Sequence, residues 1–173
     1  PMLVSSGIKT GMNILMDNPK TVGSDMIVDA VAAIREYPAP IIIIDMGTAT
    51  TMSVVDRAGN YIGGVILPGL YVSLDSLSSK AAQLPSISLD IPKRVIGKNT
   101  VDCMRSGAMY GNAGMIDGII ERMEDELGET ATVIATGGLS RFVVPLCRHK
   151  ITYDETLLLK GLLILYEKNV TVQ

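Results

Sequence analysis

The sequence predicts an α/β protein, and three observations indicate this class. Four consecutive isoleucines follow Pro40 and end at Asp45, and this short β-branched run is typical of a buried strand. Several later segments repeat apolar residues at the spacing of an amphipathic helix. Predicted strands and helices then alternate toward the end of the chain, which is the order expected of helices packed on a sheet.

Composition narrows the possible functions. The 173 residues are 47% hydrophobic, enough for the core of one domain or one and a half. A net charge of −3 argues against a surface that binds nucleic acid or anionic membranes. No apolar run approaches the roughly 20 residues of a membrane span, and no leader is recognisable, so we expect a cytoplasmic protein. Cys103, Cys147 and the single His149 lack the spacing of a zinc site.

The first 39 residues predict a loop-rich segment followed by one helix. Residues 3–5 form a candidate short strand, and turn-forming residues fill 7–19. An apolar pattern at Ile27, Val31 and Ile34 then predicts a helix of about three turns, capped by Ser24 or Asp25 and ending before Pro38. An aspartate at a helix start usually serves as a cap, so the local sequence alone does not assign Asp25 a functional role.

The turn after the isoleucine strand is a candidate phosphate site. Gly47 permits a tight turn, and the small side chains of residues 48–51 leave backbone N–H groups and hydroxyls accessible to an anion. Asp45 is placed to hold a hydrated divalent cation. An ordinary Asp-x-Gly turn between two core strands is the alternative interpretation.

Two more strands and a helix should follow. Residues 52–55 and 61–67 predict strands joined by a hairpin turn at 56–60. Leucines at helical spacing predict a helix from Leu70 to about Gln83, stopped by Leu84-Pro85.

The longest helical region is predicted at 101–127, after an extended linker. Asn99 or Thr100 can cap it, and Gly128 ends it. Residues 101–114 are rich in small side chains, which allow close approach of a ligand or, more commonly, of another helix.

The remainder predicts strand, helix, strand and helix. A buried strand at 131–135 runs into Gly137-Gly138, whose backbone can approach a ligand or start a helix. A short helix at 139–146 and a strand at 150–152 follow. Asp154 should cap a closing helix with four leucines facing inward, namely Leu157, Leu158, Leu162 and Leu165.

This order of elements resembles the second lobe of the actin-like ATPase (ribonuclease H-like) fold found in actin, sugar kinases and Hsp70. The resemblance implies that residues 1–39 are the tail of a first lobe and that 40–173 form the second lobe, with a helical insertion at about 98–128. Six motifs resemble type III pantothenate kinase: Gly23-Ser-Asp25, Asp45-x-Gly47-Thr48-Ala49-Thr50-Thr51, Gly63-Gly64-x-Ile66-x-Pro68-Gly69, Leu84-Pro85, Ile96-Gly97-Lys98-Asn99-Thr100 and Thr136-Gly137-Gly138.

The resemblance implies an activity and its partners. Type III pantothenate kinase uses ATP to phosphorylate pantothenate to 4′-phosphopantothenate, the first step of coenzyme A biosynthesis. The family needs Mg²⁺ and a monovalent cation, K⁺ or NH₄⁺. It works as a homodimer in which the partner completes the substrate pocket.

The resemblance also implies roles for individual residues. Asp25 matches the aspartate of the family's Gly-x-Asp-Arg motif and would be the general base on the pantothenate hydroxyl. Asp45 would hold the metal. The phosphates and adenosine of ATP would contact Gly47, Thr48, Ala49, Thr50, Gly137 and Gly138, and pantothenate would contact Gly23, Asp25, Asn99 and Thr100.

Two departures from the family pattern qualify the expected activity. Met26 stands where the family has an arginine that could hold the pantothenate carboxylate by two hydrogen bonds. The sequence also lacks the amino-terminal Asp-x-Gly-Asn-Thr phosphate loop, so we expect an incomplete chain that is inactive alone. The alternatives are a regulatory protein of the same fold, since family members have been labelled transcription accessory factors, and a kinase for another small alcohol.

Overall fold

The computed structural model describes residue 4 and residues 8–81 and 83–170, and it confirms the α/β class. The elements, in order, are η1 (Pro19–Thr21), α1 (Ser24–Glu36), β1 (Ile41–Met46), β2 (Ala49–Val55), β3 (Tyr61–Pro68), α2 (Leu70–Lys80), α3 (Thr100–Leu127), β4 (Thr132–Thr136), α4 (Ser140–Val143), η2 (Val144–Leu146), β5 (Thr152–Tyr153) and α5 (Leu157–Val170).

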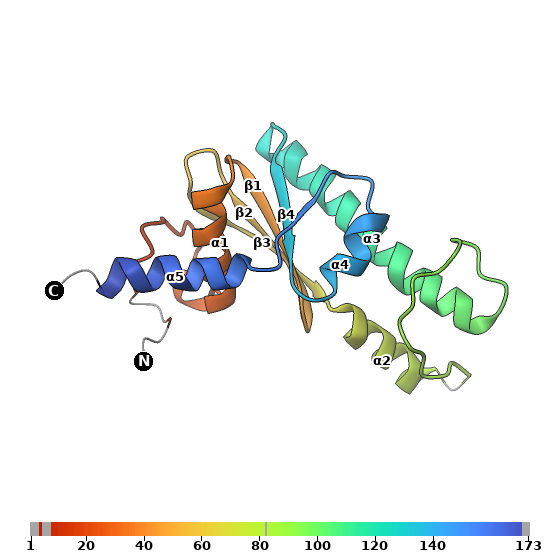
Figure 1. Cartoon of the computed structure of the whole chain (residues 1–173). Coiled ribbons are helices and arrows are strands. Elements are labelled where there is room, and N and C mark those ends of the chain that lie inside the picture. The colour runs from red at the N-terminus through yellow and green to blue at the C-terminus, as the bar shows by residue number, and fades with distance from the viewer. Residues whose placement is uncertain (1–3, 5–7, 82, 171–173) are drawn as a thin grey trace.

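A five-stranded mixed sheet in the order β3-β2-β1-β4-β5 forms the middle layer. Helices α1 and α5 cover one face, and α2, α3 and α4 lie on the other side (Figure 1). Strand β1 is antiparallel to β2 but parallel to β4, and Asp45 is the register neighbour of Thr136. The carboxyl ends of β1 and β4 therefore meet at one edge, the usual place of ligand sites in open α/β sheets.

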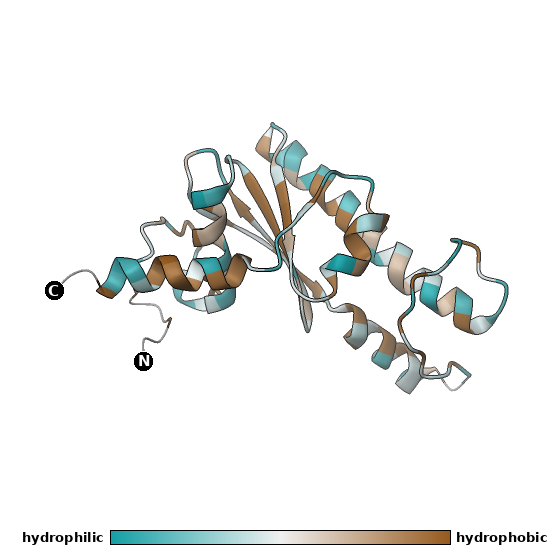
Figure 2. Ribbon diagram, in the orientation of Figure 1, coloured by the Kyte–Doolittle hydropathy of each residue, from teal (hydrophilic) through white to brown (hydrophobic). Residues whose placement is uncertain are grey.

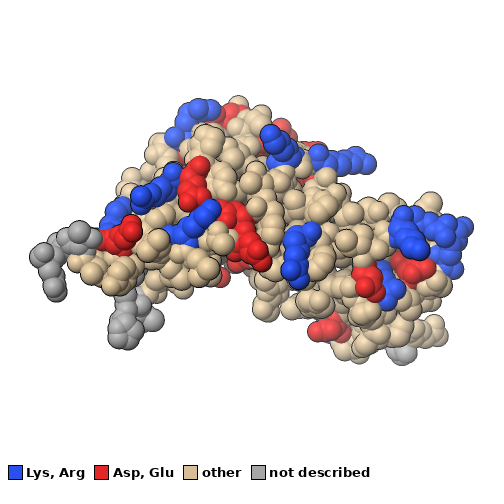
Figure 3. Space-filling model, viewed as in Figure 1, with Lys and Arg blue, Asp and Glu red and all other residues tan. Residues whose placement is uncertain are grey.

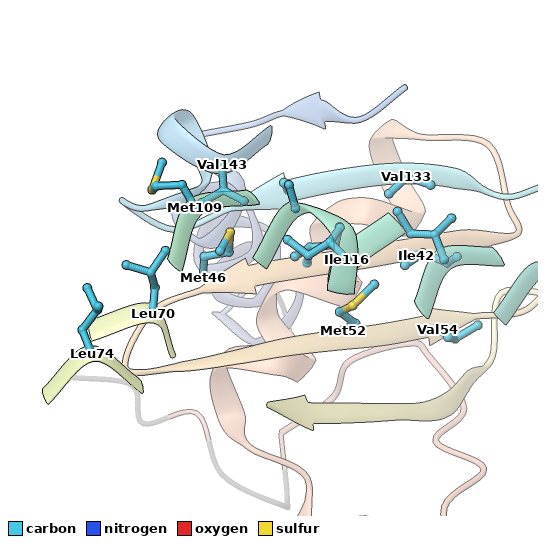
Figure 4. Close-up of a cluster of buried hydrophobic side chains, with 14 residues drawn as sticks. Ile42, Met46, Met52, Val54, Leu70, Leu74, Met109, Ile116, Val133 and Val143 are labelled. Carbon is cyan, nitrogen blue, oxygen red and sulfur yellow. The ribbon is translucent and has the colours of Figure 1, made fainter. Parts of the chain in front are cut away.

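The isoleucine run of β1 contributes to a core on each face of the sheet. Ile42 and Ile44 pack in a cluster with α2 and α3, part of which Figure 4 shows. Ile41 and Ile43 pack on the opposite face against alanines of α1. Because successive strand side chains alternate between faces, burial on both faces requires an unbroken apolar run. Figure 2 shows this hydrophobic centre between the helical layers.

Helices α1 and α5 cross closely. A Cβ atom added to Gly161 of α5 would lie 2.1 Å from the carbonyl oxygen of Val28 in α1. Beside this crossing, Lys160 Nζ lies 2.7 Å from Glu36 and 2.8 Å from Asp154. Figure 3 shows acidic and basic side chains together where the two helices meet. Close backbone packing and a small ionic network thus join these two helices.

Several boundaries differ from the predicted ones. Strand β2 begins at Ala49 rather than at residue 52, because Ala49 pairs with Pro68 and Thr50 with Leu67 of β3. Helix α2 ends at Lys80 rather than near Gln83. Strand β5 comprises only Thr152–Tyr153 rather than 150–152. The candidate strand at 3–5 lies outside the described residues except for Val4, which is not in a strand.

Two predictions about side chains are also wrong. The N-cap of α1 is Gly23, with no side-chain capping bond, so neither Ser24 nor Asp25 caps the helix. In α5, Leu157 and Leu165 are fully buried, but Leu158 and Leu162 remain 40% and 38% exposed. The helix buries a narrower face than its leucines suggest, because α1 is its main packing partner.

Within the described part of the chain, no helix is long and apolar enough to cross a membrane.

Candidate functional site

The turn between β1 and β2 lies at the carboxyl edge of the sheet and is open to solvent. Gly47 and Thr48 are both exposed. The Gly47 N–H donates to the Ala49 carbonyl over 3.0 Å, and the Gly69 N–H donates to the Thr48 carbonyl over 3.1 Å. A Cβ on Gly69 would lie only 2.1 Å from that carbonyl oxygen. The Pro68-Gly69 pair therefore packs against the turn, and only glycine fits at residue 69.

Asp45 precedes this turn and packs against the glycine pair after β4. The side chain of Asp45 is half-buried, and burial together with the charge of Asp25 raises its pKa. Gly137 has φ +87°, and a Cβ there would lie 2.6 Å from Asp45 Oδ1. A side chain at residue 137 would be strained and would displace the carboxylate. The structure thus places the Gly137-Gly138 loop directly beside Asp45.

The first turn of α1 faces the same region. Asp25 is exposed, and its Oδ1 accepts the Met26 N–H over 2.9 Å. A Cβ on Gly23 would lie 2.5 Å from this oxygen, so a side chain at residue 23 would shift the Asp25 carboxylate from this position. Met26 is half-buried and packs against the apolar cluster on the α1 side of the sheet. Asp25 and Asp45 are near enough to interact electrostatically, so the structure brings these two predicted site residues together.

A third carboxylate, Asp29, was not predicted. It is only 2% exposed, and its Oδ1 has no hydrogen-bond partner among the described residues. Burial, followed by the charges of Asp45, Asp25 and Asp154, raises the pKa of Asp29 to about 7. The available signal was its spacing, because residues four apart on a helix share a face and Asp29 therefore follows Asp25 toward the sheet.

An open cavity of about 370 Å³ lies above the turn. Gly47 and Thr48 line one side, Gly138 and Leu139 another, and Tyr71 of α2 a third. The turn and Gly138 therefore border one space, which Asp75 of α2 also lines. Ala49 follows the turn and is half-buried, whereas the side chain of Thr50 is fully buried and its hydroxyl has no partner among the described residues.

Asn99 and Thr100 lie elsewhere. The Asn99 side chain accepts the Asp102 N–H over 2.9 Å, which confirms the predicted cap of α3. Thr100 lines a separate cavity between α2 and α3. Figure 1 shows the start of α3 at the end of the molecule away from α1. A single chain therefore does not bring these two residues to Asp25.

The site suits a magnesium ion only when the ion has other ligands. The described residues contain no group of three or more acidic, histidine or cysteine side chains that could hold a metal. Mg²⁺ in phosphoryl-transfer sites usually takes one or two carboxylates and completes its shell with water and substrate phosphates. The half-buried carboxylate of Asp45, beside the exposed turn, fits that smaller requirement.

Comparisons with known proteins agree with the motifs. A family model described as type III pantothenate kinase matches residues 1–122. A protein from Bacillus cytotoxicus named type III pantothenate kinase is 46% identical over 173 residues, which are the whole of this chain and 66% of that protein. The crystal structure of a conserved Campylobacter jejuni protein, assigned to the Baf family of transcriptional activators, shares the fold with a TM-score of 0.63 at 19% identity. That match covers 93% of this chain and 70% of the other.

Proposed function

The chain belongs to the type III pantothenate kinase family, and from this premise we propose that the full-length protein uses ATP to phosphorylate pantothenate. The product would be 4′-phosphopantothenate, the first intermediate of coenzyme A biosynthesis. The observation that carries this proposal is the position of Asp45 at the carboxyl edge of the sheet, where Gly137 packs against its carboxylate and the charge of Asp25 raises its pKa. We place the reaction in the cytoplasm.

Asp25 is the proposed general base. A primary alcohol that attacks a γ-phosphoryl group needs an acceptor for its proton, and the rest of the barrier is lowered mainly by positioning and charge stabilisation. The carboxylate of Asp25 is exposed at the start of α1, where a substrate hydroxyl can approach it. Gly23 leaves room for this carboxylate in its present position, since a Cβ there would lie 2.5 Å from Asp25 Oδ1.

ATP would bind along the carboxyl edge of the sheet. Backbone groups of Gly47, Thr48, Ala49 and Thr50 would contact the phosphates, and Gly137 and Gly138 would lie against the adenosine. Asp45 would hold Mg²⁺, which neutralises the charge that develops on the transferred phosphoryl group. The requirement for K⁺ or NH₄⁺ is proposed from the family resemblance alone.

A homodimer would account for Asn99 and Thr100. These residues lie away from Asp25 within one chain (Figure 1), so we propose that they reach the pantothenate site of a second copy.

We further propose the actin-like, ribonuclease H-like architecture, with residues 40–173 as the second lobe, 98–128 as its insertion and 1–39 as the tail of the first lobe. The five-stranded mixed sheet is consistent with that architecture.

The isolated 173-residue chain should not phosphorylate pantothenate. It spans 66% of the Bacillus cytotoxicus relative, and it contains no Asp-x-Gly-Asn-Thr sequence. In the actin-like fold ATP binds between two lobes. Residues 40–173 would supply only the second lobe and its phosphate turn, so they would bind ATP without forming the complete active site. Measurable phosphorylation of pantothenate by the 173-residue chain would contradict this part of the proposal.

The central experiment is an assay for 4′-phosphopantothenate on the full-length gene product, with ATP, Mg²⁺ and K⁺. Turnover should fall by at least about a hundredfold in Asp25→Asn, the loss expected for a general base. Asp125→Asn is the matched control, since Asp125 is also an exposed helical aspartate but lies on α3. Equal activity of Asp25→Asn and wild type would exclude Asp25 as the base.

Met26 favours one alternative, a kinase for another small alcohol. It presents an apolar side chain where the family resemblance places a carboxylate-binding arginine. A screen of small alcohols with the same assay separates the two: activity on an uncharged alcohol but not on pantothenate would support the alternative. Saturable ATP binding without turnover on any alcohol would instead support the regulatory protein.

A further inference from the structure

Strand β3 exposes an aliphatic side chain on the α1 side of the sheet. The strand lies at the sheet edge, and its residues Val65 and Leu67 pack against the core on the side of α2 and α3. Because strand side chains alternate, Gly64 and Ile66 point to the opposite side, where both are exposed. Ile66 is 71% exposed. A single exposed isoleucine is ordinary on a protein surface, so its meaning depends on what lies beside it.

The strand register places Ile66 in one row with Asp45. Thr51 of β2 pairs with Asp45 of β1 on one side and with Ile66 of β3 on the other. Side chains of directly paired residues lie on the same face of a sheet. Since neighbouring strands are about 4.8 Å apart, Ile66 stands about 10 Å from Asp45 across the half-buried Thr51. An apolar, a hydroxyl and a carboxylate side chain therefore follow one another across the sheet.

Asp25 faces this row from α1. Burial and the charge of Asp25 raise the pKa of Asp45, and burial and then the same charge raise the pKa of the Tyr61 hydroxyl. The Tyr61 hydroxyl lies 3.2 Å from Ser53 Oγ, and Ser53 is next but one to Thr51 on β2. The sheet neighbours of α1 are β1 and β2. The carboxylate of Asp25 thus lies on the same side of the sheet as the row and close to its polar end.

Gly64 keeps the surface beside Ile66 open. It lies two residues before Ile66, on the same face of β3, and it is exposed. A Cβ at this position would lie 2.1 Å from the carbonyl oxygen of Met52, so the close pairing of β2 and β3 excludes a side chain there. A ligand at Asp25 can therefore reach one flank of the Ile66 side chain without displacing another residue of β3.

The proposed substrate is branched beside its reacting group. The primary hydroxyl of pantothenate is carried by a methylene attached to a carbon with two methyl groups. When that hydroxyl faces Asp25, the methyl groups must lie close by, and burying them against an apolar side chain is favourable. The side chain of Met26 already packs into the apolar cluster under α1. Ile66 offers the exposed aliphatic surface on this side of the sheet.

We propose that Ile66 is a specificity-determining residue that packs against the two methyl groups of pantothenate while the hydroxyl faces Asp25. The inference rests on the proposed function and adds to it a means of choosing the alcohol. The contact favours an alcohol with a quaternary carbon next to the reacting carbon over a straight-chain alcohol with the same hydroxyl. It also orients the hydroxyl, because the branched carbon and the reacting oxygen are only two bonds apart.

Steady-state kinetics of the full-length gene product with two substrates test this inference. The substrates are pantothenate and 2,4-dihydroxybutanoyl-β-alanine, which has hydrogens in place of the two methyl groups. Ile66→Thr keeps the branched β-carbon that suits a strand. It should lower kcat/KM for pantothenate by roughly tenfold or more, as expected for a lost apolar contact in a substrate site. It should leave kcat/KM for the analogue and the KM for ATP unchanged.

Ile62→Thr is the matched control. Ile62 lies on the same strand and is also exposed, but it lines a cavity on the side of α3. This variant should keep wild-type kcat/KM for both alcohols. Ile66→Val, which retains most of the apolar surface, should lose less activity on pantothenate than Ile66→Thr.

The outcomes separate this inference from the proposed function. An equal loss of kcat/KM for both substrates in Ile66→Thr would mean that Ile66 acts on the fold rather than on the methyl groups, and it would overturn the inference. Unchanged kcat/KM for pantothenate would also overturn it and leave the kinase proposal intact. Failure of the wild type to phosphorylate either alcohol would overturn the proposed function and this inference with it.

Discussion

The Tyr37 hydroxyl donates a 2.9 Å hydrogen bond to Asp154 Oδ2 and so joins the end of α1 to the segment before α5. Lys160 also donates to this oxygen and to Glu36. Burial opposes ionisation of Asp154, but hydrogen bonds from Lys160, Tyr37 and Thr156 outweigh it and lower the pKa. Asp154 is therefore the centre of the network that holds the two helices together.

Asp154→Asn should destabilise the chain at pH 7 by about 1–3 kcal/mol, because the amide cannot match a buried carboxylate as an acceptor. Asp154 has a lowered folded-state pKa, so its stabilisation is present above the unfolded pKa and is lost as the pH falls through the folded one. Urea unfolding should therefore show a gap between variant and wild type that narrows below about pH 4. Glu155→Gln, at the exposed neighbour, is the control. A difference in the free energy of unfolding that stays constant with pH would contradict the lowered pKa of Asp154.

Gly161→Ala should destabilise the chain by about 1–3 kcal/mol through overpacking. The added methyl would lie 2.1 Å from the Val28 carbonyl oxygen, so α1 and α5 would have to separate. Gly107→Ala in α3 is the matched control, since nothing lies within 4 Å of its Cβ position. It should raise stability by roughly 0.5–1 kcal/mol, the usual gain of alanine over glycine in a helix. Thermal unfolding of both variants tests this contrast, and equal changes in Tm would refute it.

Asp29→Asn should stabilise the chain at pH 8. The folded-state pKa of Asp29 is about 7 against an ordinary 3.8. The stability contributed by its neutral form is complete below pH 4 and is lost as the pH rises through 7. Asparagine removes this loss, so the variant should exceed the wild type by on the order of 2–4 kcal/mol at pH 8. Urea unfolding in EDTA at pH 5 and pH 8 should show the larger difference at pH 8; equal differences would mean that Asp29 does not titrate in this range.

Met26→Arg should lower the KM for pantothenate in the full-length protein by roughly tenfold, if the proposed substrate is correct. A guanidinium can bind a carboxylate by two hydrogen bonds, which a thioether cannot do. The KM for ATP should stay unchanged. Met26→Lys is the control, because it adds the charge without the planar pair of donors. An unchanged KM for pantothenate in the arginine variant would favour a different alcohol as substrate.

Local signals predicted part of this fold well. The isoleucine strand was predictable because burial on both faces leaves a continuous apolar run, and the cap at Asn99 because it depends on only four residues. The start of β2 was not predictable from local signals, since Ala49 and Thr50 are in a strand because they pair with β3, and Thr50 also with Met46 of β1. The exposure of Leu158 and Leu162 likewise depends on what covers α5 rather than on α5 itself.

The site divides in the same way. Resemblance to the family's motifs indicated Asp25, Asp45 and the Gly137-Gly138 pair, and the sheet places the last three together because β1 and β4 are parallel neighbours. Asp29 was missed because its burial depends on the elements that pack against α1, which its spacing from Asp25 does not show. The family assignment is confirmed by the comparisons, whereas the role of each residue stays a prediction until the variants are measured.

The contact between α1 and α5 also affects how the chain folds during synthesis. Glu36 and Lys160, which the ionic network joins, are 124 residues apart in the sequence. At a translation rate of roughly 5–20 residues per second, α1 leaves the ribosome about 6–25 seconds before its partner helix. During that time the apolar face of α1, with Val28 and Val31, cannot pack against α5. Chaperones that bind exposed aliphatic segments would therefore meet α1 on the nascent chain, before the helical layer can close.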